Sequence, residues 1–207
     1  MKVLITAGST WVKIDAVRIL TNRFTGRTGY YLWRQLKQKG HAVTLLINPH
    51  CIGALKGRDI VTYHYFDEFD KALGELLQHN HYDAIIHMAA VNDYQLQKPS
   101  AGKIPSGKKA LLLRLVPTEK IIQKVRKLAP NSLLIQFKLE SNRDGLINRA
   151  YQSLISNKSS FVVANALEDL ESGYKAFLVD RDRNVVPIRS QASLARILHE
   201  IIDAAHL

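Results

Sequence analysis

The sequence predicts an α/β fold: a Rossmann-like, open and mostly parallel sheet with helices on both faces and a flap loop. Three observations predict it. Short apolar runs alternate along the chain with amphipathic helical patterns, as they do in repeated βα units. The early runs are apolar throughout, as in parallel strands covered on both faces. A polar stretch at 95–110, with two prolines and two glycines, breaks this alternation and predicts the flap.

The elements follow from these patterns in order. Strands are predicted at 3–7, 42–47, 83–89, 111–116, 133–139, 161–165 and 174–179. Helices are predicted at 28–39, 67–79, 118–128, 143–157 and 191–204. The last helix has the clearest signature, because Ser190 can cap it and apolar residues between Leu194 and Ile202 form one stripe. No Pro/Gly/Ser-rich linker divides the chain, so a single domain is expected over 1–207.

The composition is that of a globular protein, with 46% hydrophobic and 23% charged residues. The single cysteine, Cys51, excludes an internal disulfide framework and fits a reducing compartment. Met1 leads directly into a strand-like run, and no apolar run is long enough to span a bilayer. We therefore expect a cytoplasmic protein that does not bind membranes.

The chain is strongly basic, with a formal net charge of +11. A positive surface suits nucleic acids or phosphorylated small molecules. The basic residues occur in small scattered groups, without paired Cys/His zinc spacing or the aromatic and basic string of RNA-binding modules. The expectation is therefore small phosphorylated ligands and no nucleic acid, with most lysines on solvated helix faces.

Ligands of open α/β sheets bind at the carboxyl ends of the strands. This rule predicts a ring of useful residues at 8–10, 89–93, 137–140 and 165. The stretch 21–40 adds Gly26 and Gly29 at the start of a helix, whose free N–H groups can hold phosphate. We expect this loop to fold back over the same edge and to carry Asn22 across the site. A plain glycine-containing loop explains these residues equally well.

Two partial motifs are coincidences. The stretch 102–109 resembles a phosphate-binding P-loop, but Lys109 stands where Ser or Thr should bind magnesium. The stretch 94–98 has the Tyr-x-x-x-Lys spacing of short-chain dehydrogenases, but Pro99 argues against the helix that this pair needs. The second strand also ends without the acidic residue that would bind an NAD ribose.

Two further candidates are ambiguous when taken singly. The small residues Ala89 and Ala90 would let a ribose lie on the backbone while Asp93 accepts its hydroxyls, but Asp93 could equally cap a turn. Lys103 on the flap could reach a phosphate, or it could be an ordinary surface lysine.

The segments VLITAGST, IDAVR, TNRFTGRTGYYL, AAVNDY, KIPS, LVPTEKI, FKLES, INRA and VVAN follow one another along nearly the whole chain. This series resembles the phosphopantothenate–cysteine ligases (phosphopantothenoylcysteine synthetases) of coenzyme A biosynthesis, and it looks closest to their stand-alone members. The resemblance implies that the carboxylate of 4′-phosphopantothenate is activated with CTP or ATP and then coupled to cysteine. It also implies Mg²⁺ carried by the triphosphate, and a homodimer in which one subunit's strands help cover the other's site.

The resemblance also implies residue roles. Asn22 would bind the substrate carboxylate and the acyl intermediate, and Lys103 would be the flap lysine that stabilises its phosphate. Both would be catalytic, gathered with Asp93 around one pocket, and no residue would bind a metal. The residues implied to contact the nucleotide are Gly8, Ser9, Ala89, Asp93, Lys103, Thr118, Ile121 and Phe137. Those implied to contact the substrate are Asn22, Gly26, Gly29, Ala90 and Asp93. Arg18 would form an internal pair in the loop or bind a ligand.

The sequence departs from the family pattern in places. Ser9 stands where proline is expected, and Val12 where glutamate is usual. Only Lys158 is expected near the triphosphate clamp, so the preference for CTP or ATP stays open. Two other functions also stay open: an NAD(P)-dependent Rossmann oxidoreductase, and a non-catalytic basic nucleic-acid-binding or regulatory protein with a ligase-like shell.

Overall fold

The computed structural model describes residues 1–53, 55, 57–169 and 173–205. Its centre is an eight-stranded sheet in the order β12-β11-β10-β9-β6-β1-β4-β5. The strands are β1 (Lys2–Ala7), β4 (Ala42–Ile47), β5 (Ile60–Thr62), β6 (Ala84–His87), β9 (Leu133–Glu140), β10 (Phe161–Ala166), β11 (Ala176–Asp180) and β12 (Val185–Ile188). All neighbours from β5 to β10 pair in parallel, whereas β11 pairs antiparallel with both β10 and β12, so β11 alone runs against the other strands. The predicted mostly parallel sheet is confirmed.

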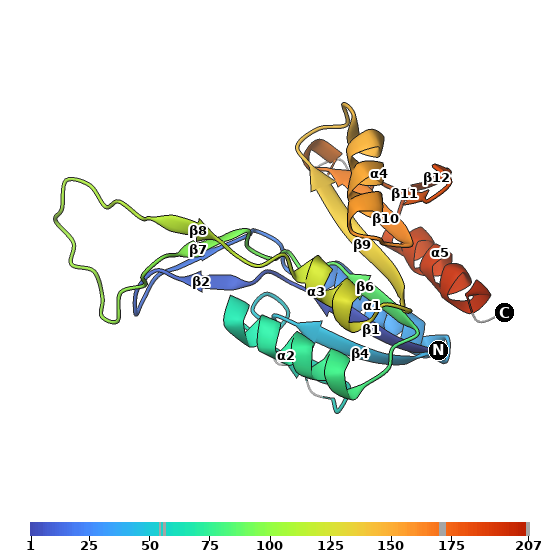
Figure 1. Ribbon diagram of the computed structural model, residues 1–207, viewed down its shortest axis with the longest axis horizontal. Coiled ribbons are helices and arrows are strands. Elements are labelled where there is room, and N and C mark those ends of the chain that lie inside the picture. The colour runs from blue at the N-terminus through green and yellow to red at the C-terminus, as the bar shows by residue number, and fades with distance from the viewer. Residues whose placement is uncertain (54, 56, 170–172, 206–207) are drawn as a thin grey trace.

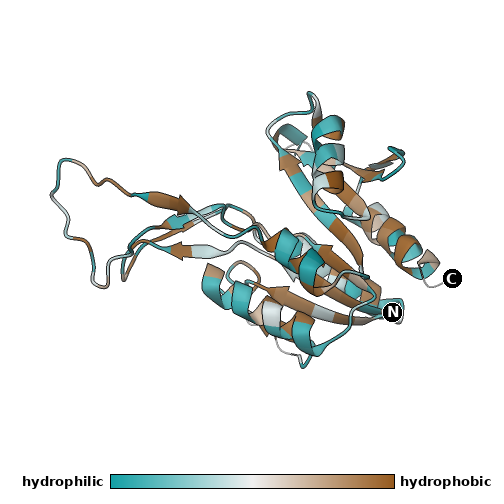
Figure 2. Cartoon of the chain, viewed as in Figure 1, coloured by the Kyte–Doolittle hydropathy of each residue, from teal (hydrophilic) through white to brown (hydrophobic). Residues whose placement is uncertain are grey.

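Helices cover both faces of this sheet, as predicted (Figure 1). They are α1 (Arg27–Gln38), α2 (Phe66–His79), α3 (Ile121–Leu128), α4 (Leu146–Ser156) and α5 (Gln191–Ala204). Successive residues of a strand point to opposite faces, so Val3 and Ile5 pack with α1 and α5 while Leu4 packs with α2 and α3. Figure 2 shows the consequence: the central strands are hydrophobic, whereas the helices alternate between hydrophobic and hydrophilic residues.

The cap of the last helix follows its sequence. Ser190 caps α5 by accepting a hydrogen bond from the backbone N–H of Ser193, as predicted.

No helix in the described ranges is long and apolar enough to cross a membrane.

Two antiparallel ribbons leave the sheet at the carboxyl end of its parallel strands. One joins β2 (Trp11–Lys13) to β3 (Ile19–Thr21), and the other joins β7 (Tyr94–Leu96) to β8 (Leu115–Pro117). Strand β2 lies against β7, and the two ribbons project together from the body of the molecule (Figure 1). We call residues 11–21 and 94–117 the arm. The stretch YQLQK lies in a strand and its continuation, so the helix needed by a dehydrogenase pair is absent there.

The arm corrects one prediction. The run at 111–116 was expected as a strand of the core, but only Leu115–Pro117 is a strand, and it pairs within the arm. Leu112 is 94% exposed, and Leu111 and Leu113 are exposed as well. Apolar composition alone does not distinguish a run buried in its own chain from one that another surface covers. The remaining unpredicted strands, β2, β3, β5, β7 and β12, are too short to carry a clear periodicity.

Candidate active site

The sheet order places a crevice between β1 and β6. The chain runs from β1 to β4 on one side and returns with β6 on the other, which makes this point the topological switch where α/β sheets bind ligands. A cavity of about 260 Å³ opens at the carboxyl ends of these strands. It is lined by Gly8, by residues 24–28 and 88–90, by Phe137 and Leu139 of β9, and by Asn165 of β10 and Tyr174.

The loop before α1 folds back over β1, as predicted. The Ser9 hydroxyl donates to the carbonyl of Phe24 at 2.7 Å. Gly26 has φ of 77°, and a Cβ atom there would lie 2.9 Å from the backbone nitrogen of Gly8. A side chain at Gly29 would clash with the Cβ atom of Ala7. Glycine therefore lets both the loop and the first turn of α1 lie directly on the end of β1.

The start of α1 is suited to bind an anion. The N-cap residue Gly26 has no side chain to cap this helix, and Thr25 accepts only a long hydrogen bond of 3.4 Å from the N–H of Arg27. The first turn holds no acidic residue. The free N–H groups of a helix start carry partial positive charge, and Arg27 beside them lines the cavity. Phosphate is the ligand that this arrangement favours.

Asn22 stands at the rim of the cavity. Its side-chain amide donates to the carbonyl of Ala90 at 3.0 Å, and Ala90 lines the cavity. The side chain of Asn22 remains exposed. The bond ties the loop before α1 to the end of β6 and leaves the asparagine within reach of a bound ligand.

Buried polar groups brace the end of β1, and the sequence pattern did not reveal them. The Tyr63 hydroxyl donates to the carbonyl of Ala7 at 2.7 Å, and Asn48 donates to the carbonyl of Ser9 at 2.7 Å. Burial raises the pKa of Tyr63, so it stays a donor. Beside them, His87 lies 2.9 Å from the Thr6 hydroxyl, and burial lowers the pKa of His87 to about 4. These pairings have no local signature, because their partners meet only across strands.

Three of the expected nucleotide contacts lie elsewhere. Asp93 is exposed and pairs with Lys120 at 2.6 Å. The Thr118 backbone N–H donates to the Asp93 carbonyl at 3.0 Å. Ile121 is buried beneath α3 in the hydrophobic core, so only its main chain is available to a ligand.

Lys103 lies on the segment between β7 and β8, which forms the far end of the arm (Figure 1). The N–H of its neighbour Ile104 donates to the Asp15 carboxylate at 3.0 Å, and Arg18 donates to the Ile104 carbonyl. The hydrogen bond from the Ile104 N–H, together with those from Val17 and Arg18, lowers the pKa of the Asp15 carboxyl. Arg18 also pairs with Asp15, which confirms the internal pair considered for it.

Within a single chain, Asn22, Asp93 and Lys103 do not gather around the cavity between β1 and β6, so their shared pocket stays a prediction for the assembled protein. Among the described residues, none of the three lines the cavity between β1 and β6. The physical reason is the arm, which carries the flap outward instead of back over its own sheet edge.

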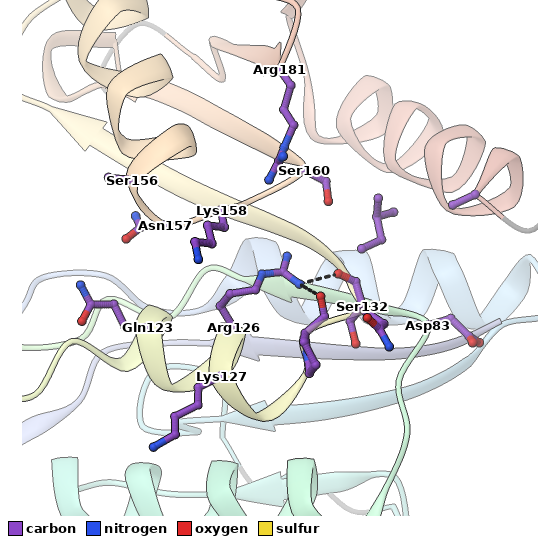
Figure 3. A pocket seen from close by; sticks show the side chains of 14 residues that line it. Asp83, Gln123, Arg126, Lys127, Ser132, Ser156, Asn157, Lys158, Ser160 and Arg181 are labelled. Atoms are coloured by element: carbon purple, nitrogen blue, oxygen red, sulfur yellow. Dashed lines mark hydrogen bonds between the residues drawn. The ribbon is translucent and has the colours of Figure 1, made fainter.

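A larger cavity, of about 800 Å³, lies at the opposite, amino-terminal edge of the parallel strands (Figure 3). Lys158 lines it together with Arg126 and precedes β10, as expected. Lys158 therefore lies at the edge opposite the cavity between β1 and β6, and the residues that would hold a triphosphate stay open. Burial and the charge of Arg181 lower the pKa of Arg126. Both arginines donate to main-chain carbonyls, including that of Ser132 from Arg126, and thereby brace turns.

Comparison with known proteins decides the family. The family model described as DNA/pantothenate metabolism flavoprotein C-terminal domain matches residues 1–204. The chain belongs to this family. The family assignment agrees with the resemblance seen in the sequence and with the cavity at the switch point.

One relative and two solved structures illustrate the match to the DNA/pantothenate metabolism flavoprotein family. The coenzyme A biosynthesis bifunctional protein CoaBC of Thermococcus kodakarensis is 32% identical over 206 residues, which cover 98% of this chain and 51% of that protein. The chain thus spans about half the length of this relative. The crystal structure of the DNA/pantothenate metabolism flavoprotein from Streptococcus pneumoniae superimposes with a TM-score of 0.87 at 26% identity, covering 99% of both chains. The crystal structure of the C-terminal domain of a CoaBC protein shares the fold, with a TM-score of 0.79 at 24% identity over 99% of this chain and 95% of that one.

Proposed function

We propose that this member of the family is a phosphopantothenate–cysteine ligase, and that residues 1–207 form one catalytic domain. The observation that carries the proposal is the cavity where the uncapped start of α1 meets the end of β6, with Asn22 fastened to the Ala90 carbonyl at its rim. The name of the Thermococcus relative, a coenzyme A biosynthesis protein, supports the same pathway for this chain.

The first step activates a carboxylate. A carboxylate oxygen of 4′-phosphopantothenate attacks the α-phosphorus of CTP or ATP, the bond to the β-phosphate oxygen breaks, and pyrophosphate leaves. The chain's part is to hold and orient phosphates, which the N–H groups at the start of α1 and the charge of Arg27 supply. Ala89 and Phe137 provide flat apolar contact for the nucleotide.

The second step forms the amide. The cysteine amine attacks the acyl carbon, the bond to the phosphate oxygen breaks, and the nucleoside monophosphate leaves while the amine gives up a proton to water. In this proposal Asn22 orients the acyl carbonyl, and its hydrogen bond to the Ala90 carbonyl at the cavity rim supports that role. A misoriented carbonyl would slow this step more than the first.

The described lining residues of the cavity contain no carboxylate. They therefore do not fit the oxygen-rich site that binds Mg²⁺ directly. Mg²⁺ would arrive with the triphosphate, and no step is assigned to residues that hold it.

We further propose that two copies complete the site. The cavity, at about 260 Å³, is smaller than the ~300–1,000 Å³ typical of small-molecule sites. The arm exposes a cluster of apolar side chains that monomeric proteins rarely leave uncovered. Its members are Val17, Tyr94, Leu111, Leu112, Leu113 and Leu115. A second copy seated on this arm would cover them and bring Lys103 of one subunit to the cavity of the other.

The direct test is an assay of the purified chain with 4′-phosphopantothenate, cysteine, Mg²⁺ and either CTP or ATP. Release of pyrophosphate together with the mass of phosphopantothenoylcysteine would support the ligase. Comparison of the reaction with CTP and the reaction with ATP would assign the nucleotide. Absence of both products with either nucleotide overturns the proposal.

A further inference from the structure

Two histidines and an aspartate converge at the amino-terminal edge of the sheet, away from the proposed active site. His41 lies in the turn between α1 and β4, while His199 and Asp203 are one helical turn apart on α5. Helices α1 and α5 pack together, which brings the three side chains into contact although 158 positions separate the two histidines. Their ligand atoms, one from each residue, all lie within 4.8 Å of one another.

The distances within this cluster are close to those that a bound metal ion requires. His41 Nε2 lies 2.9 Å from His199 Nδ1, a hydrogen bond. Asp203 oxygens lie 3.6 Å from His41 Nε2 and 3.5 Å from His199 Nδ1, which is too long for hydrogen bonds. Metal–ligand bonds of about 2.0–2.1 Å in a tetrahedron place the ligand atoms about 3.3–3.4 Å apart. The two carboxylate distances are near this edge length but belong to different oxygens of Asp203, so this side chain has to turn to bind through one of them. The histidine pair has to open by a few tenths of an ångström.

The surroundings also suit metal ligands. The side chain of His41 is 3% exposed, that of His199 is 22% exposed and that of Asp203 is 56% exposed. The site is closed on the protein side by His41 and open to water at Asp203, which leaves a fourth position for solvent.

We propose that His41, His199 and Asp203 bind one divalent metal ion of the Zn²⁺ class. The ion fastens α5 to the turn that leads into β4. When it binds, the proton shared by the two rings moves to another ring nitrogen or to water, so that His41 Nε2 and His199 Nδ1 both present lone pairs. Two imidazoles and one carboxylate are ligands that Zn²⁺ accepts in tetrahedral sites.

The test uses the full chain with Cys51→Ser, because the exposed thiol of Cys51 is a competing zinc ligand. After dialysis against a chelator, Zn²⁺ is titrated by calorimetry and Co²⁺ by visible absorption. We expect one ion per chain and the intense bands of tetrahedral Co²⁺. Removal of a ligand in His199→Ala or Asp203→Asn should weaken binding at least about tenfold, as even outer-shell changes do.

The matched control is His79→Ala, which removes an exposed histidine at the end of α2 and should leave binding unchanged. Asp203→Asn keeps the shape of an exposed side chain, so it tests the site even where His199→Ala disturbs folding. Zn²⁺ should also raise the melting temperature of the Cys51→Ser chain more than that of the Asp203→Asn chain. Absence of stoichiometric binding, or binding that both ligand variants retain, overturns the proposal. These readouts do not depend on ligase activity.

Discussion

The Asn22 side-chain amide and the Ala90 carbonyl lie 68 positions apart in the sequence and are joined by a hydrogen bond of 3.0 Å. This bond ties the loop before α1 to the end of β6, the two segments that frame the proposed active site. Asn22 is thus both a brace of the cavity and a candidate ligand for the substrate. A test of its role must separate these two effects.

The substitution Asn22→Asp removes both the brace and the contact with the acyl group, and the two reaction steps distinguish these effects. A disturbed cavity should slow both steps, whereas a lost contact should slow only the second. The substitution keeps the size of the side chain but replaces the donor amide with an acceptor, so the second step should lose about a hundredfold in rate. The first step should continue, so pyrophosphate is released and acyl-nucleotide accumulates, which mass spectrometry of quenched reactions would detect. Asn131→Asp, an exposed change at the opposite edge, is the control. Normal turnover in Asn22→Asp would show that the assigned role is wrong.

The contact between Gly29 and Ala7 predicts a loss of stability. In Gly29→Ala the new methyl group clashes with β1, and the resulting shift of α1 should cost about 1–3 kcal/mol of the free energy of unfolding. Urea unfolding measures this cost. Gly74→Ala is the matched control, because Gly74 is also helical but its Cβ atom would meet only the flexible end of Lys124 at 3.5 Å. This control should gain up to about 1 kcal/mol, and equal losses in both variants would contradict the packing argument.

Lys103 should act on the cavity of the other subunit. Neither Asn22→Asp nor Lys103→Ala should form much product alone. An equal mixture, after exchange of subunits, should recover about a quarter of the wild-type activity, because half of the dimers pair the two variants and each has one intact site. Lys109→Ala, on the same segment, should remain active. A mixture with no recovery would show that Lys103 does not act across the dimer.

The exposed leucines of the arm should hold the dimer together. Leu112→Glu places a charge at a position that is 94% exposed in the single chain, so it should leave the fold intact and shift the mass measured by light scattering from dimer to monomer. Ile155→Glu is the control, since Ile155 is 47% exposed on α4, outside the arm. A Leu112→Glu chain that remains dimeric would place the interface elsewhere.

His87 predicts how stability depends on pH. Its pKa is about 4 in the folded chain and near 6.5 in the unfolded chain, so the unfolded state binds more protons between these values. Stability should be full above pH 6.5 and fall as the pH drops toward 4, by about 3 kcal/mol from this group. Urea unfolding between pH 4.5 and 7 checks this, and His87→Gln should flatten the profile. His79→Ala should keep the wild-type slope, and an unchanged slope in His87→Gln would contradict the assignment.

Particular elements show where sequence reasoning succeeded. The helix at 191–204 was predicted with its cap at Ser190, because its cap and apolar stripe are local features. The strand at 42–47 was also predicted from a local feature, because a buried parallel strand is a continuous apolar run. By contrast, the run 111–116 was expected in the core, because its leucines have the composition of a buried strand. Whether this run lies in the core or on the exposed arm depends on contacts between distant segments, which the run itself does not encode.

The sequence by itself therefore determined the α/β class, the alternation of strands and helices, and the family resemblance carried by motifs from VLITAGST to VVAN. Each of these depends on residues close together in the chain. Only the tertiary structure decided which distant groups meet: the start of α1 with the ends of β1 and β6, Asn22 with Ala90, and His41 with His199. It also separated Lys103 from the cavity of its own chain. The physical reason is that side-chain contacts between remote segments arise from the order and direction of the strands, which no short stretch of sequence encodes.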